Sequence, residues 1–165
     1  MEVAITGATG FVGTALVRKH LECGDSIRVL VRDPDAAVCR MPSVRAFRGD
    51  LAVAQAIPPD FVANADVIYH CAAELRDERM MKETNVQGTR ILARLAAGRI
   101  GRWVQVSSAA VYGAVRWGTI TEDSPMQPDS LYGRTKAESE DAVWSAAGSG
   151  GYGVSVVRPS NIFGS

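Results

Sequence analysis

The sequence predicts an α/β fold in which residues 1–165 form one domain around a doubly wound parallel sheet of about six strands. Short β-branched runs alternate with longer segments of helical spacing, which is typical of consecutive βαβ units. Most of the short runs are nearly continuous in apolar residues, as expected for strands covered on both faces. The chain of 165 residues is also long enough to bury one core of useful size.

The elements are expected in a regular order along the chain. Strands are predicted at residues 2–6, 27–32, 44–48, 67–70, 103–107 and 154–158. Helices are predicted at residues 11–22, 78–97 and 131–147, with a shorter one at 51–57. Residues 111–130 contain two glycines and two prolines with little periodicity, which predicts a long loop of the kind that is often functional. Residues 148–151 are interpreted as a flexible turn before the last strand.

The composition excludes several classes of function. Eighteen basic residues balance eighteen acidic ones, so no net field attracts nucleic acid or an anionic membrane. The sequence shows neither a secretory signal pattern nor an apolar run approaching the roughly 20 residues of a membrane span, so we expect a cytoplasmic protein. Cys23, Cys39 and Cys71 lack the spacing of metal ligands, and no metal site is expected.

A glycine-rich turn connects the first strand to the first helix. Gly7 permits a tight turn, Gly10 lets the backbone approach a phosphate, and Gly13 lets the helix lie close to the strand. Free N–H groups at the helix N-terminus then bind a pyrophosphate without a basic side chain. The turn could be glycine-rich for no functional reason, but its position between strand and helix favours a Rossmann-type dinucleotide site.

The end of the second strand bears on the choice of dinucleotide. An acidic residue there binds the ribose hydroxyls of NAD, whereas an arginine pairs with the 2′-phosphate of NADP. Arg32 comes first and Asp33 follows, so NADP is the preferred cofactor and NAD remains possible. The alternative is that both are solvated loop charges beside Pro34. Asp50, after the third strand, could accept the adenine amino group or serve as a helix N-cap.

Tyr132 and Lys136 form the candidate acid–base pair. Residues four apart on a helix share a face, so both side chains can point at one ligand. Lowering a phenol pKa from about 10 to near 7 requires roughly 4 kcal/mol, which a nearby ammonium and an oxidised nicotinamide can supply. Tyr132 would exchange a proton with a substrate hydroxyl or carbonyl, while Ser108 hydrogen-bonds the same oxygen. An isolated pair of this kind is more often a surface helix contact.

Further motifs extend through the whole chain, at residues 6–13, 49–51, 70–73, 85–89, 106–113, 121–125, 132–136 and 158–164. With them the chain resembles the extended short-chain dehydrogenase/reductase family, in its NAD(P)-dependent epimerase/dehydratase group, over the N-terminal cofactor-binding part. The resemblance implies that Ser108, Tyr132 and Lys136 are catalytic, because the family serine lies four residues before the tyrosine of Val-Tyr-Gly. The complete expected cofactor-binding set is Gly7, Thr9, Gly10, Phe11, Val12, Gly13, Arg32, Asp50, Leu51, Ala72, Ala73, Asn85, Ser107, Tyr132, Lys136, Pro159 and Ser160.

Two departures from the family narrow the expected function. Similar dehydratases carry an Asp-Glu pair where this chain has Ala109 and Ala110, so dehydration is the weaker option beside nucleotide-sugar epimerisation or carbonyl reduction. Similar proteins continue into a substrate-binding C-terminal lobe, so if the 165 residues are the whole protein we expect residues 154–158 to form an exposed sheet edge. Water would then reach the hydride-transfer site, and turnover by this chain alone would be poor or absent unless a partner or second subunit covers the cleft.

Two further expectations concern partners. The alternative to an enzyme domain that acts on a carbonyl compound or nucleotide sugar is a non-catalytic NAD(P)-binding sensor or partner-binding module. In similar proteins the two helices predicted at residues 78–97 and 131–147 pair across a two-fold axis, so we expect a homodimer.

Overall fold

The computed structural model describes residues 1–114 and 118–164. Within these residues six strands form one sheet, with all neighbouring pairs parallel, in the order β3-β2-β1-β4-β5-β6. The predicted fold class is confirmed, with small shifts at the strand ends. The strands are β1 (Glu2–Thr6), β2 (Ser26–Val31), β3 (Val44–Arg48), β4 (Ala65–His70), β5 (Ile100–Val106) and β6 (Gly153–Val157).

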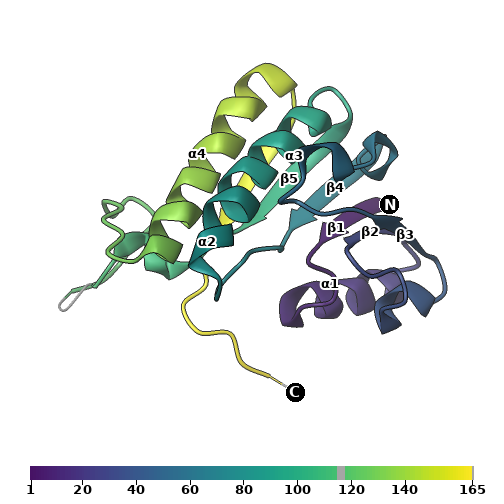
Figure 1. Cartoon of the computed structure of the whole chain (residues 1–165), viewed down its shortest axis with the longest axis horizontal. Coiled ribbons are helices and arrows are strands. Elements are labelled where there is room, and N and C mark those ends of the chain that lie inside the picture. Colours follow the sequence, from purple (N-terminus) through teal and green to yellow (C-terminus); the bar gives the residue numbers. More distant parts are fainter. Residues whose placement is uncertain (115–117, 165) are drawn as a thin grey trace.

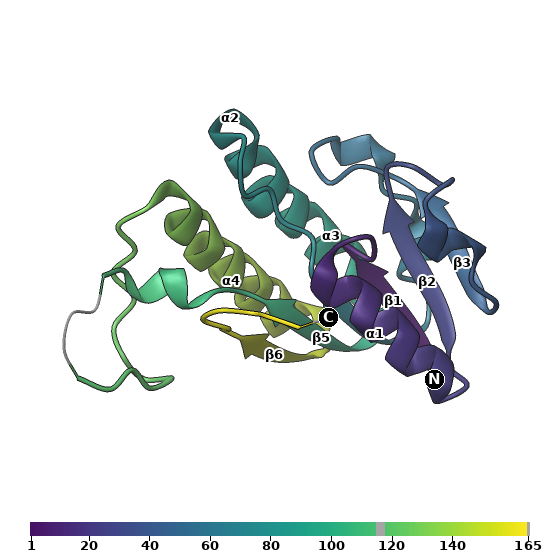
Figure 2. The same ribbon diagram turned by 90° about the horizontal axis from the view of Figure 1, so that it is seen from below.

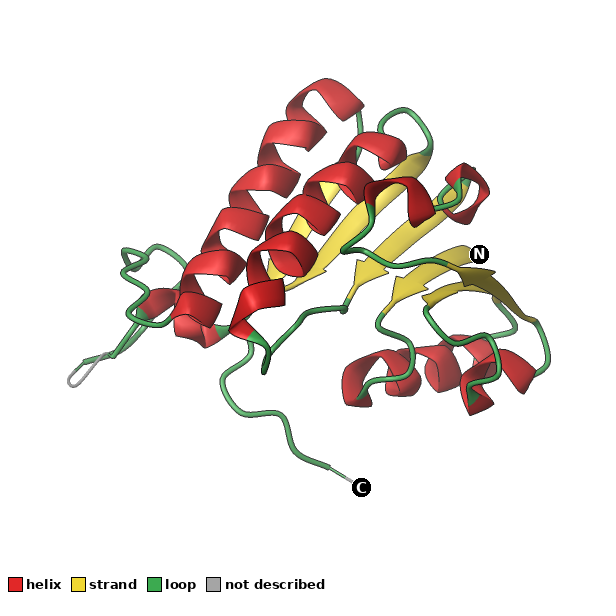
Figure 3. Cartoon of the chain, in the orientation of Figure 1, coloured by secondary structure: helices red, strands yellow, loops and turns green. Residues whose placement is uncertain are grey.

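Helices cover both faces of the sheet (Figures 1 and 3). Helix α1 (Phe11–Glu22) lies on one face, whereas α3 (Thr89–Ala96) and α4 (Leu131–Gly150) lie side by side on the other (Figures 1 and 2). Each face therefore has its own buried core, one around Val17 and Ile27 and the other around Trp103 and Leu92. Burial on both faces explains why the strand sequences are apolar almost throughout.

The helix predicted at residues 78–97 has an irregular interior that its sequence pattern did not predict. It consists of α2 (Glu78–Met81), a π-helical segment (Lys82–Gly88) and α3. A Cβ atom on Gly88 would lie 2.6 Å from the Leu51 carbonyl oxygen, so the glycine is what allows the helix to approach the turn after β3. π segments are frequent at functional sites, and this one carries Asn85.

Two element predictions were wrong. The helix predicted at residues 51–57 is only a 3₁₀ turn (Ala54–Ala56), because the turn at Asp50 precedes it and Pro58 and Pro59 follow, leaving no room for α-helical hydrogen bonds. The turn predicted at residues 148–151 is mostly helix, since α4 continues to Gly150. Only Gly151 leaves it, with a φ of 69° typical of a glycine cap.

The loop predicted at residues 111–130 begins inside a 3₁₀ turn (Ala109–Tyr112) and leads to Ser130, the N-cap of α4. Residues 115–117 of this loop lie outside the described residues. Among the described residues, strand β6 forms one edge of the sheet. Its last residue, Val157, is 50% exposed.

The order of the strands determines where a ligand can bind. Strand β1 pairs with β2 on one side and with β4 on the other, so the direction of the chain across the sheet reverses beside β1. In open parallel sheets a crevice forms at the carboxyl ends of the strands where this reversal occurs. The glycine-rich turn follows β1 and therefore lies at this crevice.

Candidate functional site

A cavity of about 460 Å³ lies at the carboxyl ends of β1, β2 and β4. Most of the residues expected to bind a cofactor line it, namely Gly7, Thr9, Gly10, Phe11, Val12, Gly13, Arg32, Asp50, Leu51, Ala72 and Ala73. These residues are spread over more than sixty positions of the sequence, but the parallel strands that precede them all end at the same edge of the sheet. The cavity adjoins the glycine turn, and its wall extends toward α2.

The glycine turn requires its glycines for steric reasons. Gly7 has a φ of 69°, and a Cβ atom there would lie 2.7 Å from the Ala72 backbone nitrogen. A Cβ atom on Gly13 would lie 2.2 Å from the Gly7 carbonyl oxygen. Gly10 is the N-cap of α1 and has no side chain that could cap the helix, and residues 11–13 of the first helical turn line the cavity. This turn fits a pyrophosphate group.

The end of β2 places Arg32 in the cavity wall as an exposed side chain. Asp33 is directed into a local turn, because its Oδ1 accepts a hydrogen bond from the Asp35 backbone N–H at 2.9 Å. Asp50 lines the cavity as well, and its Oδ1 accepts from the Ala52 N–H at 2.9 Å. Arg32 and Asp50 therefore both contribute charge to the cavity wall, whereas Asp33 is not among its lining residues.

The remaining expected cofactor residues, Asn85, Ser107, Tyr132, Lys136, Pro159 and Ser160, lie outside the lining of this cavity as the described residues define it. Ser107 follows β5, and among the described residues its buried Oγ has no hydrogen-bond partner. An orphaned buried hydroxyl suits a ligand that brings its own polar group. Pro159 is held beside the Ser108 turn, where its carbonyl accepts from the Ala109 N–H at 2.9 Å, and Ser160 is exposed.

The three expected catalytic residues come from two elements that pack together. Ser108 is the N-cap of the 3₁₀ turn after β5, and its Oγ accepts from the Ala110 N–H at 3.1 Å. Tyr132 and Lys136 both lie in the first part of α4, whose N-terminus is capped by Ser130. The Lys136 ammonium is buried and donates to the Val106 carbonyl oxygen at 2.6 Å, which connects α4 to the end of β5.

Burial affects the ionisation of both members of the pair in the protein without a dinucleotide. Burial raises the pKa of the Tyr132 phenol above its ordinary value, and the neighbouring Ser108 hydroxyl acts in the opposite direction. Burial lowers the pKa of Lys136 to about 8, although Glu140 and Cys71 oppose this shift. In the protein alone Tyr132 is therefore a protonated phenol at neutral pH, whereas most Lys136 side chains remain charged.

Asn85 braces the cavity wall. Its Oδ1 accepts from the Glu74 N–H at 2.7 Å, and its Nδ2 donates to the Glu74 carbonyl at 3.0 Å and to Thr135 Oγ1 at 3.1 Å. The side chain therefore pairs with the backbone of the loop after β4 and connects that loop to α4. The sequence-based hypothesis placed Asn85 at the cofactor, whereas its described contacts support the loop beside the cavity.

His70 is fully buried between two threonines. Thr89 Oγ1 donates to the Asn85 carbonyl at 2.6 Å, so it must accept from His70 Nε2 at 2.8 Å. His70 Nδ1 then accepts from Thr6 Oγ1 at 2.7 Å. Burial lowers the pKa of His70 to about 3, with Lys136 adding to the shift, so the ring is neutral. This connected chain of bonds ties the ends of β1 and β4 to α3.

Sequence reasoning missed several residues of the site. The cavity wall also includes Cys71, Glu74, Leu75, Met80 and Thr84, from the loop after β4 and the helix that follows it. The sequence carries no spacing signal for them, because loop geometry places them. Glu140 was also missed, although its position four residues after Lys136 puts it on the same face of α4.

Two negative findings complete the description. Within residues 1–114 and 118–164 no group of three or more His, Cys, Asp or Glu side chains is arranged to hold a metal ion. No helix in the described part of the chain is both long and apolar enough to span a membrane.

Comparison with known proteins agrees with this geometry. A dTDP-glucose 4,6-dehydratase of Streptomyces griseus is 35% identical over 97% of the chain and 54% of its own length. A short-chain dehydrogenase/reductase superfamily protein of Agrobacterium tumefaciens with bound NAD superposes with a TM-score of 0.85, at 28% identity, over 96% of this chain and 48% of that one. The dTDP-glucose 4,6-dehydratase DesIV of Streptomyces venezuelae, solved with NAD and TYD, gives a TM-score of 0.84 at 31% identity, over 96% and 55% of the two chains.

The chain spans about half the length of the curated relatives that it matches. The model of the NAD dependent epimerase/dehydratase family matches residues 3–165, which is nearly the whole sequence. The glycine turn at the switch in strand order, the cavity beside it and this match lead to one conclusion: the chain belongs to the NAD dependent epimerase/dehydratase family.

Proposed function

We propose that residues 1–165 form the dinucleotide-binding domain of an NAD(P)-dependent oxidoreductase or nucleotide-sugar epimerase. The observation that carries this proposal is the cavity, which joins the glycine turn to the end of β2 and to the loop after β4. The turn suits a pyrophosphate, and Arg32 in the cavity wall suits an adenosine 2′-phosphate. The family and the NAD-bound solved structures support this assignment.

The proposed chemistry assigns a separate role to each residue of the α4 site. Tyr132, which is protonated at neutral pH, donates a proton to a substrate carbonyl and accepts one in the reverse reaction. Ser108 holds the same oxygen, and the charged Lys136 stabilises the phenolate as it forms. When bound, the dinucleotide supplies or accepts the hydride.

The proposed substrate is a nucleotide sugar or another carbonyl compound. The dehydratases among the relatives act on dTDP-glucose by name, which supports the nucleotide-sugar class. The turn after the catalytic serine carries Ala109 and Ala110, and neither side chain can donate a proton to a departing hydroxyl group. We therefore propose epimerisation or carbonyl reduction in preference to dehydration.

We expect Arg32→Ala to weaken NADP binding about tenfold to a hundredfold, because a hydrogen bond to a charged group contributes about 1.5–3 kcal/mol. NAD affinity should be unchanged, since NAD lacks the 2′-phosphate. Calorimetric titration of the unmodified and altered chains with both dinucleotides measures these effects. Arg18→Ala is the matched control, because Arg18 is an exposed residue of α1 outside the cavity lining.

The same titrations decide between the proposals. Equal weakening of NAD and NADP by Arg32→Ala would contradict a role in recognising the 2′-phosphate. If the unmodified chain bound neither dinucleotide, the cofactor function itself would be refuted. Binding without any turnover, for every carbonyl and nucleotide-sugar substrate tried, would instead favour the sensor or partner-binding module.

The proposed assembly is a homodimer that pairs α3 and α4 of two copies. These helices lie side by side on one face of the sheet (Figure 1), and the Trp144 side chain of α4 is 52% exposed. A buried aromatic anchor is common at the centre of an interface. Size-exclusion chromatography with light scattering at micromolar concentration should show a dimer, and Trp144→Glu should shift it toward monomer. A monomer for the unmodified chain would count against this assembly.

A further inference from the structure

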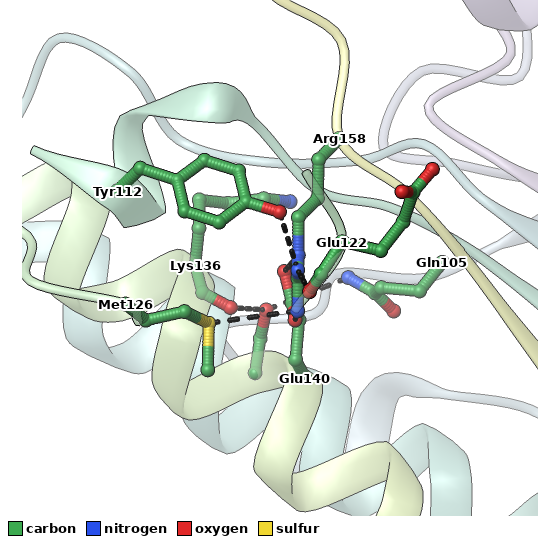
Figure 4. A network of polar contacts seen from close by, with 8 residues as sticks. Gln105, Tyr112, Glu122, Met126, Lys136, Glu140 and Arg158 are labelled. Carbon is green, nitrogen blue, oxygen red and sulfur yellow. Dashed lines mark hydrogen bonds and ion pairs between the residues drawn. The ribbon is translucent and has the colours of Figure 1, made fainter. Parts of the chain in front are cut away.

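A polar network outside the cavity surrounds Arg158 (Figure 4). Its Nε donates to both carboxylate oxygens of Glu140, at 3.1 and 3.2 Å, and its Nη2 donates to Oε2 at 2.7 Å. Its Nη1 donates to the Tyr112 hydroxyl at 2.6 Å and to the Glu122 carbonyl at 3.3 Å, while Nη2 also contacts Met126 Sδ at 3.6 Å. All nitrogens of the guanidinium group therefore have acceptors.

The partner carboxylate is buried within the fold. The Glu140 side chain is 1% exposed and that of Arg158 is 20% exposed. Hydrogen bonding to Glu140 raises the pKa of Arg158, so the guanidinium group stays charged. A buried ion pair is rarely the most stabilising choice, because apolar replacements of similar volume are often neutral or better. A bidentate pair does, however, fix the relative orientation of its two partners.

The pair connects the two elements that carry the proposed catalytic residues. Glu140 follows Tyr132 by two helical turns and so lies on the same face of α4. Tyr112, bound by Arg158, ends the 3₁₀ turn whose N-cap is Ser108. Arg158 therefore joins the helix of the tyrosine to the turn of the serine.

Two close backbone contacts hold the same turn from either side. The Ala109 N–H donates to the Pro159 carbonyl at 2.9 Å, immediately after Arg158. On the opposite side, a Cβ atom on Gly133 would lie 2.4 Å from the Ala110 carbonyl oxygen, so α4 packs directly against the turn. The turn is thus held between α4 and the segment that follows β6, and the ion pair spans these two supports.

We propose that Arg158 and Glu140 are positioning residues, whose ion pair holds the Ser108 turn against α4 so that Ser108 and Tyr132 face the same substrate oxygen. The catalytic meaning of this arrangement rests on the proposed function, but the coupling between the pair and the effect of the Ser108 hydroxyl on Tyr132 does not. Neither residue touches the cavity that would hold the dinucleotide, so their effect is confined to the acid–base side of the site.

The test is a double-mutant cycle on the titration of Tyr132. A fluorinated tyrosine incorporated at position 132 has a more acidic phenol, so it titrates while the protein is folded, and it gives one ¹⁹F resonance to follow. Burial raises the pKa of Tyr132 and the Ser108 hydroxyl opposes the rise. Ser108→Ala should therefore raise this pKa further.

Glu140→Gln is expected to raise the Tyr132 pKa as well, because the turn that holds Ser108 loosens. The double variant should show no larger rise than Ser108→Ala alone, since both changes remove the same contact. Loss of the Glu140 charge by itself has the opposite sign, because removing a nearby negative charge favours the phenolate. Glu140→Gln also removes a charge that raises the pKa of Lys136, and loss of the Lys136 ammonium would raise the Tyr132 pKa. Arg158→Lys keeps both charges of the ion pair, so this variant separates positioning from electrostatics.

Arg158→Lys keeps the positive charge but loses the bidentate geometry, and it should behave like Glu140→Gln. Arg158→Lys also serves as the test variant if Glu140→Gln does not fold. Asp141→Asn removes an exposed carboxylate from the next position of α4 and should leave the titration unchanged. An unchanged or lowered pKa in both variants, or effects that add to those of Ser108→Ala, would overturn the proposal. Titration of the unmodified chain with NAD tests the proposed function separately. A failure to bind NAD would refute that function but would not contradict the coupling between the ion pair and Tyr132.

Discussion

Tyr132→Phe is expected to lower turnover by about 10²–10⁴-fold, the usual contribution of a positioned general acid or base. The change removes one oxygen from a half-buried ring, so it takes away the proton donor without opening a large cavity. Dinucleotide affinity should remain unchanged, because Tyr132 lies outside the lining of the cavity. The measurements are the turnover rate with a nucleotide sugar or carbonyl substrate that the chain accepts, and calorimetric titration with NAD and NADP.

Tyr69→Phe is the matched control for this prediction. Tyr69 lies in β4 and packs against His20 of α1, with ring centroids 5.2 Å apart, so its hydroxyl belongs to the opposite face of the sheet. Its removal should leave turnover unchanged. Equal activity of Tyr132→Phe and the unmodified chain would exclude the proposed proton transfer, whatever the substrate.

Gly13→Ala is expected to abolish measurable dinucleotide binding and to lower the free energy of unfolding by about 1–3 kcal/mol, the usual cost of overpacking. The new Cβ atom would lie 2.2 Å from the Gly7 carbonyl oxygen and 2.8 Å from the Ala8 Cα, and both neighbours are backbone atoms. Relief requires the glycine turn to move away from α1, which displaces the N–H groups that bind the pyrophosphate. Chemical denaturation and calorimetry with NAD measure the two effects.

Gly148→Ala makes the same substitution where there is room for it. Gly148 lies in α4, and no atom lies within 4 Å of a Cβ atom placed on it. Replacing this helical glycine should raise the free energy of unfolding by about 0.5–1 kcal/mol without affecting binding. A Gly13→Ala variant as stable and as tightly binding as the unmodified chain would contradict the proposed role of the turn.

Most of the fold was predictable from short-range patterns. The strands of this sheet are buried on both faces, so their apolar runs stand out from the helical segments between them. The glycine turn was equally visible, because its three glycines are required by contacts within the strand–turn–helix unit itself. The two wrong predictions occurred at residues 51–57 and 148–151. In the first, hydrogen bonding at Asp50 and two prolines prevented a helix, and in the second, helical packing tolerated glycine.

The candidate site was predictable only in part. The helical spacing of Tyr132 and Lys136 places both on one face of α4, and the structure keeps them there. That spacing says nothing about burial, so it could not show that burial raises the pKa of Tyr132 or that the Lys136 ammonium bonds to Val106. The bracing role of Asn85 depends on a π-helical segment and on the loop at Glu74, which no local pattern revealed.

The identity of the elements, the glycine turn and the order of the motifs therefore came from the sequence, because each depends on residues close together along the chain. The cavity wall after β4, the hydrogen-bonded chain through His70 and the Arg158–Glu140 pair came only from the folded structure. Thr6 and His70, which bond directly, are separated by 64 residues and meet because neighbouring parallel strands end at one edge of the sheet, whereas the Arg158–Glu140 pair forms because α4 packs beside β6. Such contacts depend on distances in the folded structure, which the spacing of residues along the chain does not predict.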